Sequence, residues 1–132
     1  MNDPAARQHW DAAVAMGVIR IGAGITLLRK RDFAIQFCGG SPDDRLLKGL
    51  FTFWGIRDIG LGLSAFAATR PGESVPKQVV SHGVADTVDT AIIGGLIATE
   101  RLPRGRGTMA ALFAAGTAVA EYATAWRLKQ VA

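Results

Sequence analysis

Cysteine is almost absent from this chain of 132 residues, because Cys38 is the only one. A single cysteine excludes an intramolecular disulfide and any metal site built from several thiolates, so we expect Cys38 to be a free structural thiol. Nucleophilic catalysis also lacks support, because no serine or cysteine stands in a recognisable nucleophile turn.

Clustered charge of one sign is scarce as well. The net charge is +4, but the 15 Lys and Arg residues are spread over the termini and loops. The one basic run, Arg29-Lys30-Arg31, directly follows an apolar segment. That position favours the flank of a membrane segment over an RNA site, and we expect no nucleic-acid partner.

Apolar residues and glycine are plentiful, at 49% of the chain and 16 residues respectively. A membrane-spanning helix needs about 20 mostly apolar residues. Small residues are enriched where such helices pack, because they let the backbones approach closely. The pattern predicts a single membrane domain over residues 1–132 with four glycine-packed helices. These are expected at residues 4–30, 42–69, 76–100 and 108–129, with a short interfacial segment at 32–40.

Helix start and stop signals support these boundaries. Asp3-Pro4 and Ser41-Pro42 each place a capping acceptor before a proline, which is typical of a helix N-terminus. Arg70-Pro71-Gly72 and Leu102-Pro103 mark turns between helices. The predicted fold is therefore all-α: a four-helix transmembrane bundle of up-down-up-down topology. The predicted location is the cell membrane, as a multi-pass integral membrane protein.

An internal repeat relates the first two predicted helices. When Arg20 is aligned with Asp58, Gly17, Gly22 and Gly24 fall on glycines 55, 60 and 62. A common origin or convergence on one packing pattern would both produce this match. In either case the two helices are expected to face each other, with Arg20 meeting Asp58. A double replacement of that pair should then cost much less stability than the two single replacements together.

Three motifs carry a resemblance to a known family. They are the Arg-Ile-Gly-x-Gly run at 20–24, the string GIRDIGLGL at 55–63, and the pair Asp86-x-x-Asp89. Together they resemble an uncharacterised family of small four-helix integral membrane proteins with a glycine–Arg-Asp–glycine motif in the second helix. The resemblance implies an architecture and no agreed activity.

Six ionisable groups fall inside the predicted helices. A charge at membrane depth costs roughly 2.5–3.5 kcal/mol on insertion scales, so such groups are expected to converge and neutralise one another. Two guanidiniums face four carboxylates, and the excess predicts that at least one acid keeps its proton near neutral pH. The groups are Arg20, Arg57, Asp58, Asp86, Asp89 and Glu121.

His82, Asp86 and Asp89 share one helical stripe. A metal site is one interpretation of the stripe, but a polar face inside a bundle is far commoner, so neither a metal nor a cofactor is expected. The catalytic candidates are Asp58, Asp86, Asp89, Arg57 and Arg20. The ligand-binding candidates are Glu121, His82, Trp54 and Tyr122.

Two functions fit this pattern. In the first, the buried Arg/Asp cluster forms a pocket for a lipophilic small molecule and can support acid–base chemistry of the isomerase, hydrolase or cyclase type. In the second, the protein is a non-catalytic accessory or structural subunit of a membrane complex, and the charges only fix helix register. The expected partners are membrane lipid, a lipophilic ligand, and a second copy or a membrane complex. A soluble helical bundle is the remaining alternative.

Overall fold

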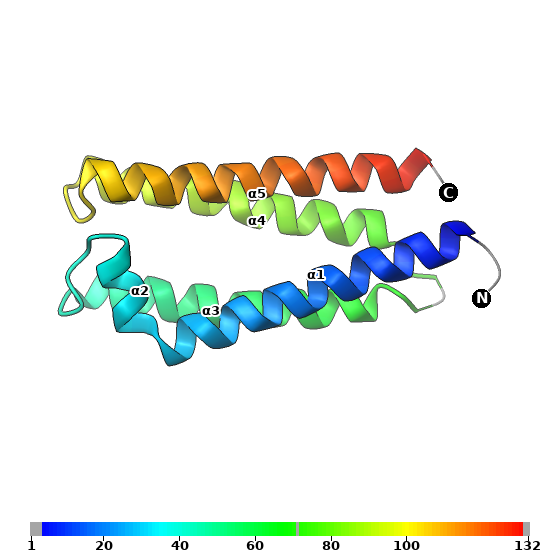
Figure 1. Ribbon diagram of the computed structural model, residues 1–132, viewed down its shortest axis with the longest axis horizontal. Helices are drawn as coiled ribbons and strands as arrows, with labels where there is room; N and C mark the ends of the chain where they lie inside the picture. The colour runs from blue at the N-terminus through cyan, green and yellow to red at the C-terminus, as the bar shows by residue number, and fades with distance from the viewer. Residues whose placement is uncertain (1–3, 71, 131–132) are drawn as a thin grey trace.

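The computed structural model describes residues 4–70 and 72–130, which form an elongated bundle of helices (Figure 1). The predicted all-α fold is confirmed. Four long helices run along the molecule, and a short helix, α2, lies across one end. The bounds are α1 Pro4–Arg29, α2 Arg31–Phe37, α3 Arg45–Ala67, α4 Val75–Ala98 and α5 Arg104–Gln130.

Side-chain caps decide where two of the helices begin. The Asp44 carboxylate accepts hydrogen bonds from the backbone N–H groups of Leu46 and Leu47, at 2.8 and 3.3 Å. Such a cap satisfies N–H groups that have no partner inside the helix. Helix α3 therefore begins at Arg45 rather than at the predicted residue 42. Ser74 caps α4 in the same way, with proline in its first turn.

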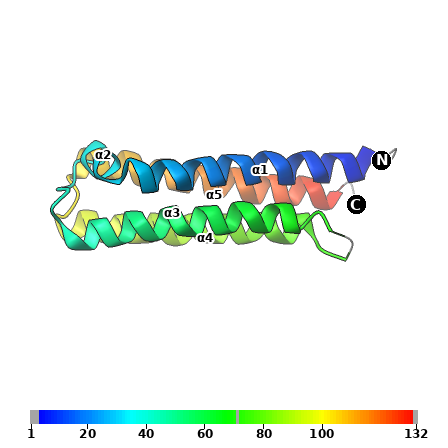
Figure 2. The ribbon, with the colours of Figure 1, turned by 90° about the horizontal axis from the view of Figure 1, so that it is seen from below.

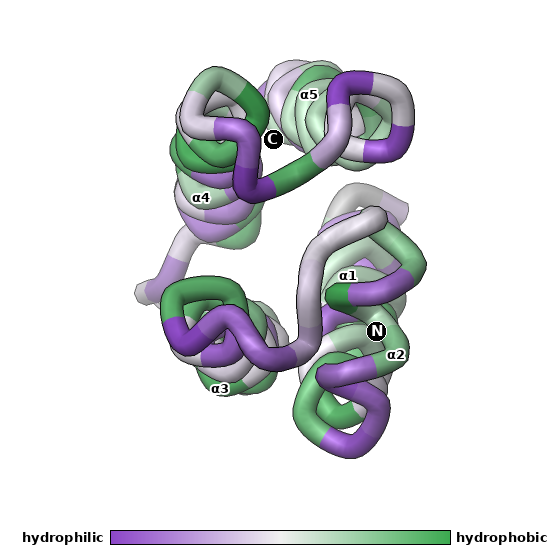
Figure 3. Tube along the Cα trace, turned by 90° about the vertical axis from the view of Figure 1, so that its left-hand side faces the viewer, coloured by the Kyte–Doolittle hydropathy of each residue, from purple (hydrophilic) through white to green (hydrophobic). Residues whose placement is uncertain are grey.

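The long helices form two antiparallel pairs, α1 with α3 and α4 with α5. Packing is extensive within each pair and sparse between the pairs. Seen end-on, the four helices occupy the corners of a rough square, with α2 beside the end of α1 (Figure 3). Helix α1 begins and α5 ends at one end of the molecule, whereas α2 and the α4–α5 turn lie at the other (Figure 2).

Glycines bring α1 and α3 into close contact. A Cβ atom at Gly24 would lie 2.5 Å from the carbonyl oxygen of Gly55, and one at Gly62 would lie 2.7 Å from that of Gly17. The repeat correctly predicted that these glycines face each other. Gly22 and Gly60 belong to the same repeat, but a Cβ atom at either position would meet nothing within 4 Å. Only part of the repeated pattern therefore serves packing.

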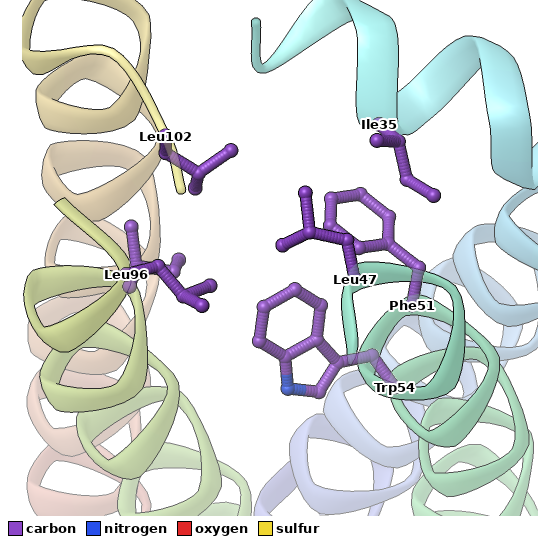
Figure 4. Close-up of a cluster of buried hydrophobic side chains, with 7 residues drawn as sticks. Ile35, Leu47, Phe51, Trp54, Leu96 and Leu102 are labelled. Atoms are coloured by element: carbon purple, nitrogen blue, oxygen red, sulfur yellow. The ribbon is translucent and has the colours of Figure 1, made fainter. Parts of the chain in front are cut away.

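Two apolar clusters close the ends of the bundle. At the α2 end, Leu96 and Leu102 point across the gap between the helix pairs toward Leu47, Phe51 and Trp54 (Figure 4). At the other end, a second cluster is formed by Ala13, Val75, Val79, Ala125 and Leu128. The charged residues lie between these two clusters. The core is thus apolar at both ends and ionic in the middle.

The prediction of a four-helix transmembrane bundle was wrong, and the multi-pass location receives no support. Among the described residues, one helix is long and apolar enough to cross a membrane: α1, over Ala6–Arg29. Helix α3 carries Arg57 and Asp58, α4 carries a polar stripe, and α5 is rich in alanine and glycine. The chain also has five helices in its described part, because a fifth helix, α2, overlaps the predicted 32–40 segment.

Large apolar side chains are nevertheless exposed on every long helix. Val18 on α1, Phe53 on α3, Val88 on α4 and Val119 on α5 are 60, 56, 51 and 68% exposed. The interior instead buries four ionisable residues: Asp58, His82, Asp86 and Asp89. This distribution differs from that of a typical water-soluble domain, which buries its large apolar residues and keeps most charges at the surface.

Candidate functional site

Arg20 is the centre of the ionic cluster and contacts acids from three other helices. Its guanidinium lies 3.3 Å from Asp58 on α3, 2.8 Å from Asp86 on α4 and 2.6 Å from Glu121 on α5. The predicted meeting of Arg20 and Asp58 is confirmed. The structure adds two partners that the repeat alone did not indicate.

Arg57 forms the second half of the cluster. Its Nη1 lies 2.5 Å from Asp89 Oδ1 and its Nη2 lies 2.7 Å from Asp89 Oδ2, which is the two-pronged geometry favoured by guanidinium and carboxylate. Nη2 also donates to Asp58 at 2.9 Å. Asp58 therefore bridges the two arginines, and the six predicted groups form one continuous network.

The network is shielded from solvent but unequal in charge. The side chains of its members are between 6 and 17% exposed. Two guanidiniums face four carboxylates, as the sequence indicated, so the cluster has two more acids than bases. Because an unpaired buried charge is strongly unfavourable, the excess favours protonation of an acid or entry of a cation.

His82 extends the network at the side of Glu121. Its ring is completely buried, and its Nε2 lies 3.1 Å from the Leu61 carbonyl oxygen and 3.2 Å from the Gln78 amide. A carbonyl can only accept, so the contact with Leu61 places the hydrogen on Nε2 and leaves a lone pair on Nδ1. The Gln78 amide nitrogen is also a donor, so in this tautomer it lies beside Nε2 without a hydrogen bond to it. Nδ1 has no hydrogen-bond partner in the described part of the chain and lies 3.9 Å from Glu121 Oε1.

Glu121 holds one satisfied and one unsatisfied oxygen. Oε1 accepts from Arg20, whereas Oε2 is buried and finds no partner within residues 4–70 and 72–130. Burial raises the pKa of Glu121 to about 7, against the opposing effect of Arg20. Burial and the positive charge of Arg20 lower the pKa of His82 to about 4. Near neutral pH the imidazole is thus uncharged and the carboxyl is near its titration midpoint.

A cavity of about 820 Å³ lies next to the cluster. The six charged residues of the cluster form most of its polar wall. Its remaining walls are mostly apolar and come from both helix pairs, chiefly α1, α3 and α5. Its large apolar lining side chains include Ile19, Leu27, Phe51, Trp54, Met109 and Phe113.

The sequence-predicted ligand-binding residues divide into two groups. Glu121 and Trp54 line the cavity, and Trp54 is only 8% exposed. His82 lies behind Glu121 and does not line the cavity. Tyr122 also lies outside the lining: its ring packs over Gly83, and its hydroxyl is 3.2 Å from Thr87 Oγ1.

Several lining residues were missed by sequence reasoning. They include Phe37 and Cys38 near the end of α2, and Met109, Phe113 and Thr117 of α5. Helix α5 is alanine-rich on all sides, so its residues show no periodic signal for an inward face. Burial raises the pKa of the Cys38 thiol, which keeps it protonated and unreactive.

Metal binding receives no support from the geometry. Within the described residues, no group of three or more His, Cys, Asp or Glu side chains is arranged to hold a metal ion. The carboxylates of the cluster are instead occupied by guanidiniums.

No family model matches this chain, and neither a curated protein nor a solved structure matches it. The resemblance to a family of small membrane proteins therefore stays a prediction.

Proposed function

We propose that the protein binds a lipophilic small molecule, with its apolar part in the cavity and its polar end at the ionic cluster. One observation carries the proposal: a largely apolar cavity of about 820 Å³ ends at a buried Arg/Asp/Glu network. Its size falls within the roughly 300–1,000 Å³ of small-molecule sites, which also combine apolar walls with a few polar groups.

The cavity distinguishes this function from a purely structural role. Ion pairs that only hold helices in register need no empty space beside them, and close packing would stabilise them better. Here each helix pair is closely packed internally, but the two pairs make few contacts with each other. The cavity lies where a ligand would replace the missing contacts between α1 and α5.

We also propose that membrane lipid is a partner. Exposed apolar side chains on all four long helices support this, together with the length and apolar character of α1. Large exposed apolar surfaces usually mark contact with a protein or a membrane. A lipid environment would also deliver a lipophilic ligand to the cavity. Flotation with phosphatidylcholine vesicles that persists after an alkaline carbonate wash supports this partner, whereas release by the wash indicates a soluble bundle.

Trp54 provides a direct test of ligand binding. Trp10 and Trp126 are exposed, and replacing both by phenylalanine leaves Trp54 as the one tryptophan of the chain. Bromoundecanol, whose bromine quenches tryptophan on close approach, is titrated into this variant in dodecyl maltoside micelles. We expect saturable quenching of Trp54.

Two further variants distinguish quenching by bromoundecanol bound in the cavity from quenching by bromoundecanol dissolved in the micelle. Ala114 lines the cavity, so Ala114→Phe should fill it and abolish saturable quenching. Ala123 is an exposed position of the same helix, and Ala123→Phe should leave quenching unchanged. Equal, non-saturable quenching in all three proteins would overturn the proposal and favour the accessory-subunit role.

A further inference from the structure

Helix α5 lines the cavity with a stripe whose two ends carry opposite charges. Arg106 stands at one end and Glu121 at the other, and the lining side chains between them are alanine, methionine, phenylalanine and threonine. These lining positions recur every three or four residues, so they share one face of the helix. The separation of 15 residues between the two ends corresponds to about 22 Å along a helix. The wall is therefore mostly apolar over the length of a long alkyl chain and polar at both ends.

The cavity opens sideways between α1 and α5, beside α2. Ile19 of α1, Phe37 of α2, and Met109 and Phe113 of α5 all line it, although each is between 68 and 75% exposed. Lining side chains with so much exposed surface stand at the rim of the cavity and not in its depth. Helices α1 and α5 also make few contacts with each other. A long molecule can therefore enter from the side and lie along α5.

Arg106 is held beside this opening with its charge unneutralised. Its Nη1 donates to the Gln36 carbonyl oxygen at 3.2 Å, and its Cδ would lie 3.3 Å from a Cβ atom at Gly39. Within residues 4–70 and 72–130 no carboxylate pairs with it, and its Nε and Nη2 donate to no group. These two N–H groups form an edge of the guanidinium that can bind a carboxylate by two parallel hydrogen bonds.

The other end of the stripe disfavours an anion. Four carboxylates already share Arg20 and Arg57 there. Like charges repel strongly in a site that is shielded from water. Of the described residues that line the cavity, Arg106 is the one cation that has no acid as a partner. The charges of the wall therefore orient an anionic amphiphile in one direction.

We propose that the ligand of the cavity is a long-chain carboxylate with an uncharged polar group at its far end. Its carboxylate binds Arg106, its alkyl chain lies along the α5 stripe, and its far end reaches the ionic cluster. The inference rests on the proposed binding function, which already places one polar group at the cluster, and it adds the anionic group at the other end. The excess of acids at the cluster favours a far group that donates a hydrogen bond, as a hydroxyl does.

Two competitors that differ at one end test the inference: 12-hydroxydodecanoate and 1,12-dodecanediol. Each is titrated against bromoundecanol in the variant that keeps Trp54 as its one tryptophan. The titrations are done in dodecyl maltoside at about pH 8.5, well above the ordinary pKa of a carboxyl. Recovery of Trp54 fluorescence gives the affinity of each competitor. Because the micelles are the same throughout, comparing the ratio of the two affinities between protein variants removes the contribution of the micelle.

Three substitutions in this Trp54 variant identify the group that binds the carboxylate. Arg106→Gln removes the charge and should lower the affinity for hydroxydodecanoate, relative to the diol, at least about threefold, as expected for an exposed ion pair. Arg104→Gln removes the same charge from an exposed side chain of the same helix that does not line the cavity, and should leave the ratio unchanged. Arg106→Lys keeps the charge and should retain most of the preference for hydroxydodecanoate.

The outcomes separate this inference from the binding function. If bromoundecanol shows no saturable quenching of Trp54, the proposed function and this inference both fail. If bromoundecanol binds but the ratio of affinities is unchanged in Arg106→Gln, or falls equally in Arg104→Gln, only this inference is overturned. A loss in Arg106→Lys as large as that in Arg106→Gln would also overturn it, because the charge would then not be what binds.

Discussion

Arg57 donates hydrogen bonds to both oxygens of Asp89 and so connects α3 to α4, two helices that make few other contacts. The two bonds are 2.5 and 2.7 Å long, and both side chains are largely buried. Bidentate geometry neutralises the Asp89 carboxylate on both sides. Asp89 therefore has a position suited to holding helices together, although the sequence also placed it among the catalytic candidates.

Replacing Arg57 should be more harmful than replacing Asp89. Arg57→Met leaves two buried carboxylates, Asp58 and Asp89, without this partner and should cost about 3–5 kcal/mol. Asp89→Asn keeps the shape and leaves Arg57 bound to Asp58, so we expect about 1–3 kcal/mol. Denaturant unfolding in micelles measures both. Equal losses would show that the Arg57–Asp58 bond contributes nothing.

The Arg20–Asp58 pair should not behave as an isolated pair. The sequence predicted that replacing both residues would cost much less than the sum of the single replacements. The structure shows that Arg20 also contacts Asp86 and Glu121, so Arg20→Met with Asp58→Asn still leaves two buried acids without their cation. We expect the double variant to be nearly as unstable as Arg20→Met alone. Recovery to near wild-type stability would mean that Asp86 and Glu121 do not depend on Arg20.

Much of the ionic cluster could be predicted from the sequence, because charges within long apolar helices must find one another. The repeat also placed Arg20 opposite Asp58. The cavity could not be predicted in the same way. Its apolar wall comes largely from α5, where Met109 and Phe113 are four residues apart and share a face, but alanines surround the helix and nothing marks that face as the inner one. Tyr122 is adjacent to Glu121 in sequence but on a different face of α5, so it packs on Gly83 instead.

Membrane crossing was overestimated for a related reason. Glycine and alanine are compatible with a spanning helix, but they add less hydropathy to it than leucine, isoleucine or phenylalanine do. In α5 glycine and alanine make up much of the length, and in α4 the His82–Asp86–Asp89 stripe interrupts the apolar pattern. Length and helical character were therefore predictable, but crossing of the bilayer by each helix did not follow from them.

The stability of the protein should depend on the titration of Glu121. Its pKa is raised to about 7 from an ordinary value of 4.5. A raised pKa means that folding favours the protonated form, so this contribution is complete below about pH 4.5 and is lost as the pH rises through 7. Relative to Glu121→Gln, the wild type should lose on the order of 2 kcal/mol between pH 5 and 8. A constant difference between the two proteins over this range would contradict the shift.

His82 should have the opposite effect. Its pKa is lowered to about 4 from 6.5, so folding favours the neutral ring. That contribution is complete above about pH 6.5 and is lost as the pH falls through 4. Unfolding of wild type and His82→Asn between pH 7 and 4 measures it. We expect the wild type to lose stability relative to the variant toward the acid end, and parallel curves would show that His82 does not titrate in this range.

The repeated glycines offer a matched comparison within one helix pair. A methyl group at Gly24 would lie 2.5 Å from the Gly55 carbonyl oxygen and 2.8 Å from a side-chain carbon of Ile59, so α1 and α3 would have to separate. Gly24→Ala should therefore cost about 1–3 kcal/mol, as overpacking does. Gly22, two residues away, meets nothing within 4 Å, and alanine there should be neutral or stabilising by about 0.5–1 kcal/mol, because alanine favours the helix. Denaturant unfolding of both variants in the same micelles gives the comparison. If Gly22→Ala were as damaging as Gly24→Ala, the outer face of α1 would be packed against something else, and the close α1–α3 approach would not explain the repeat.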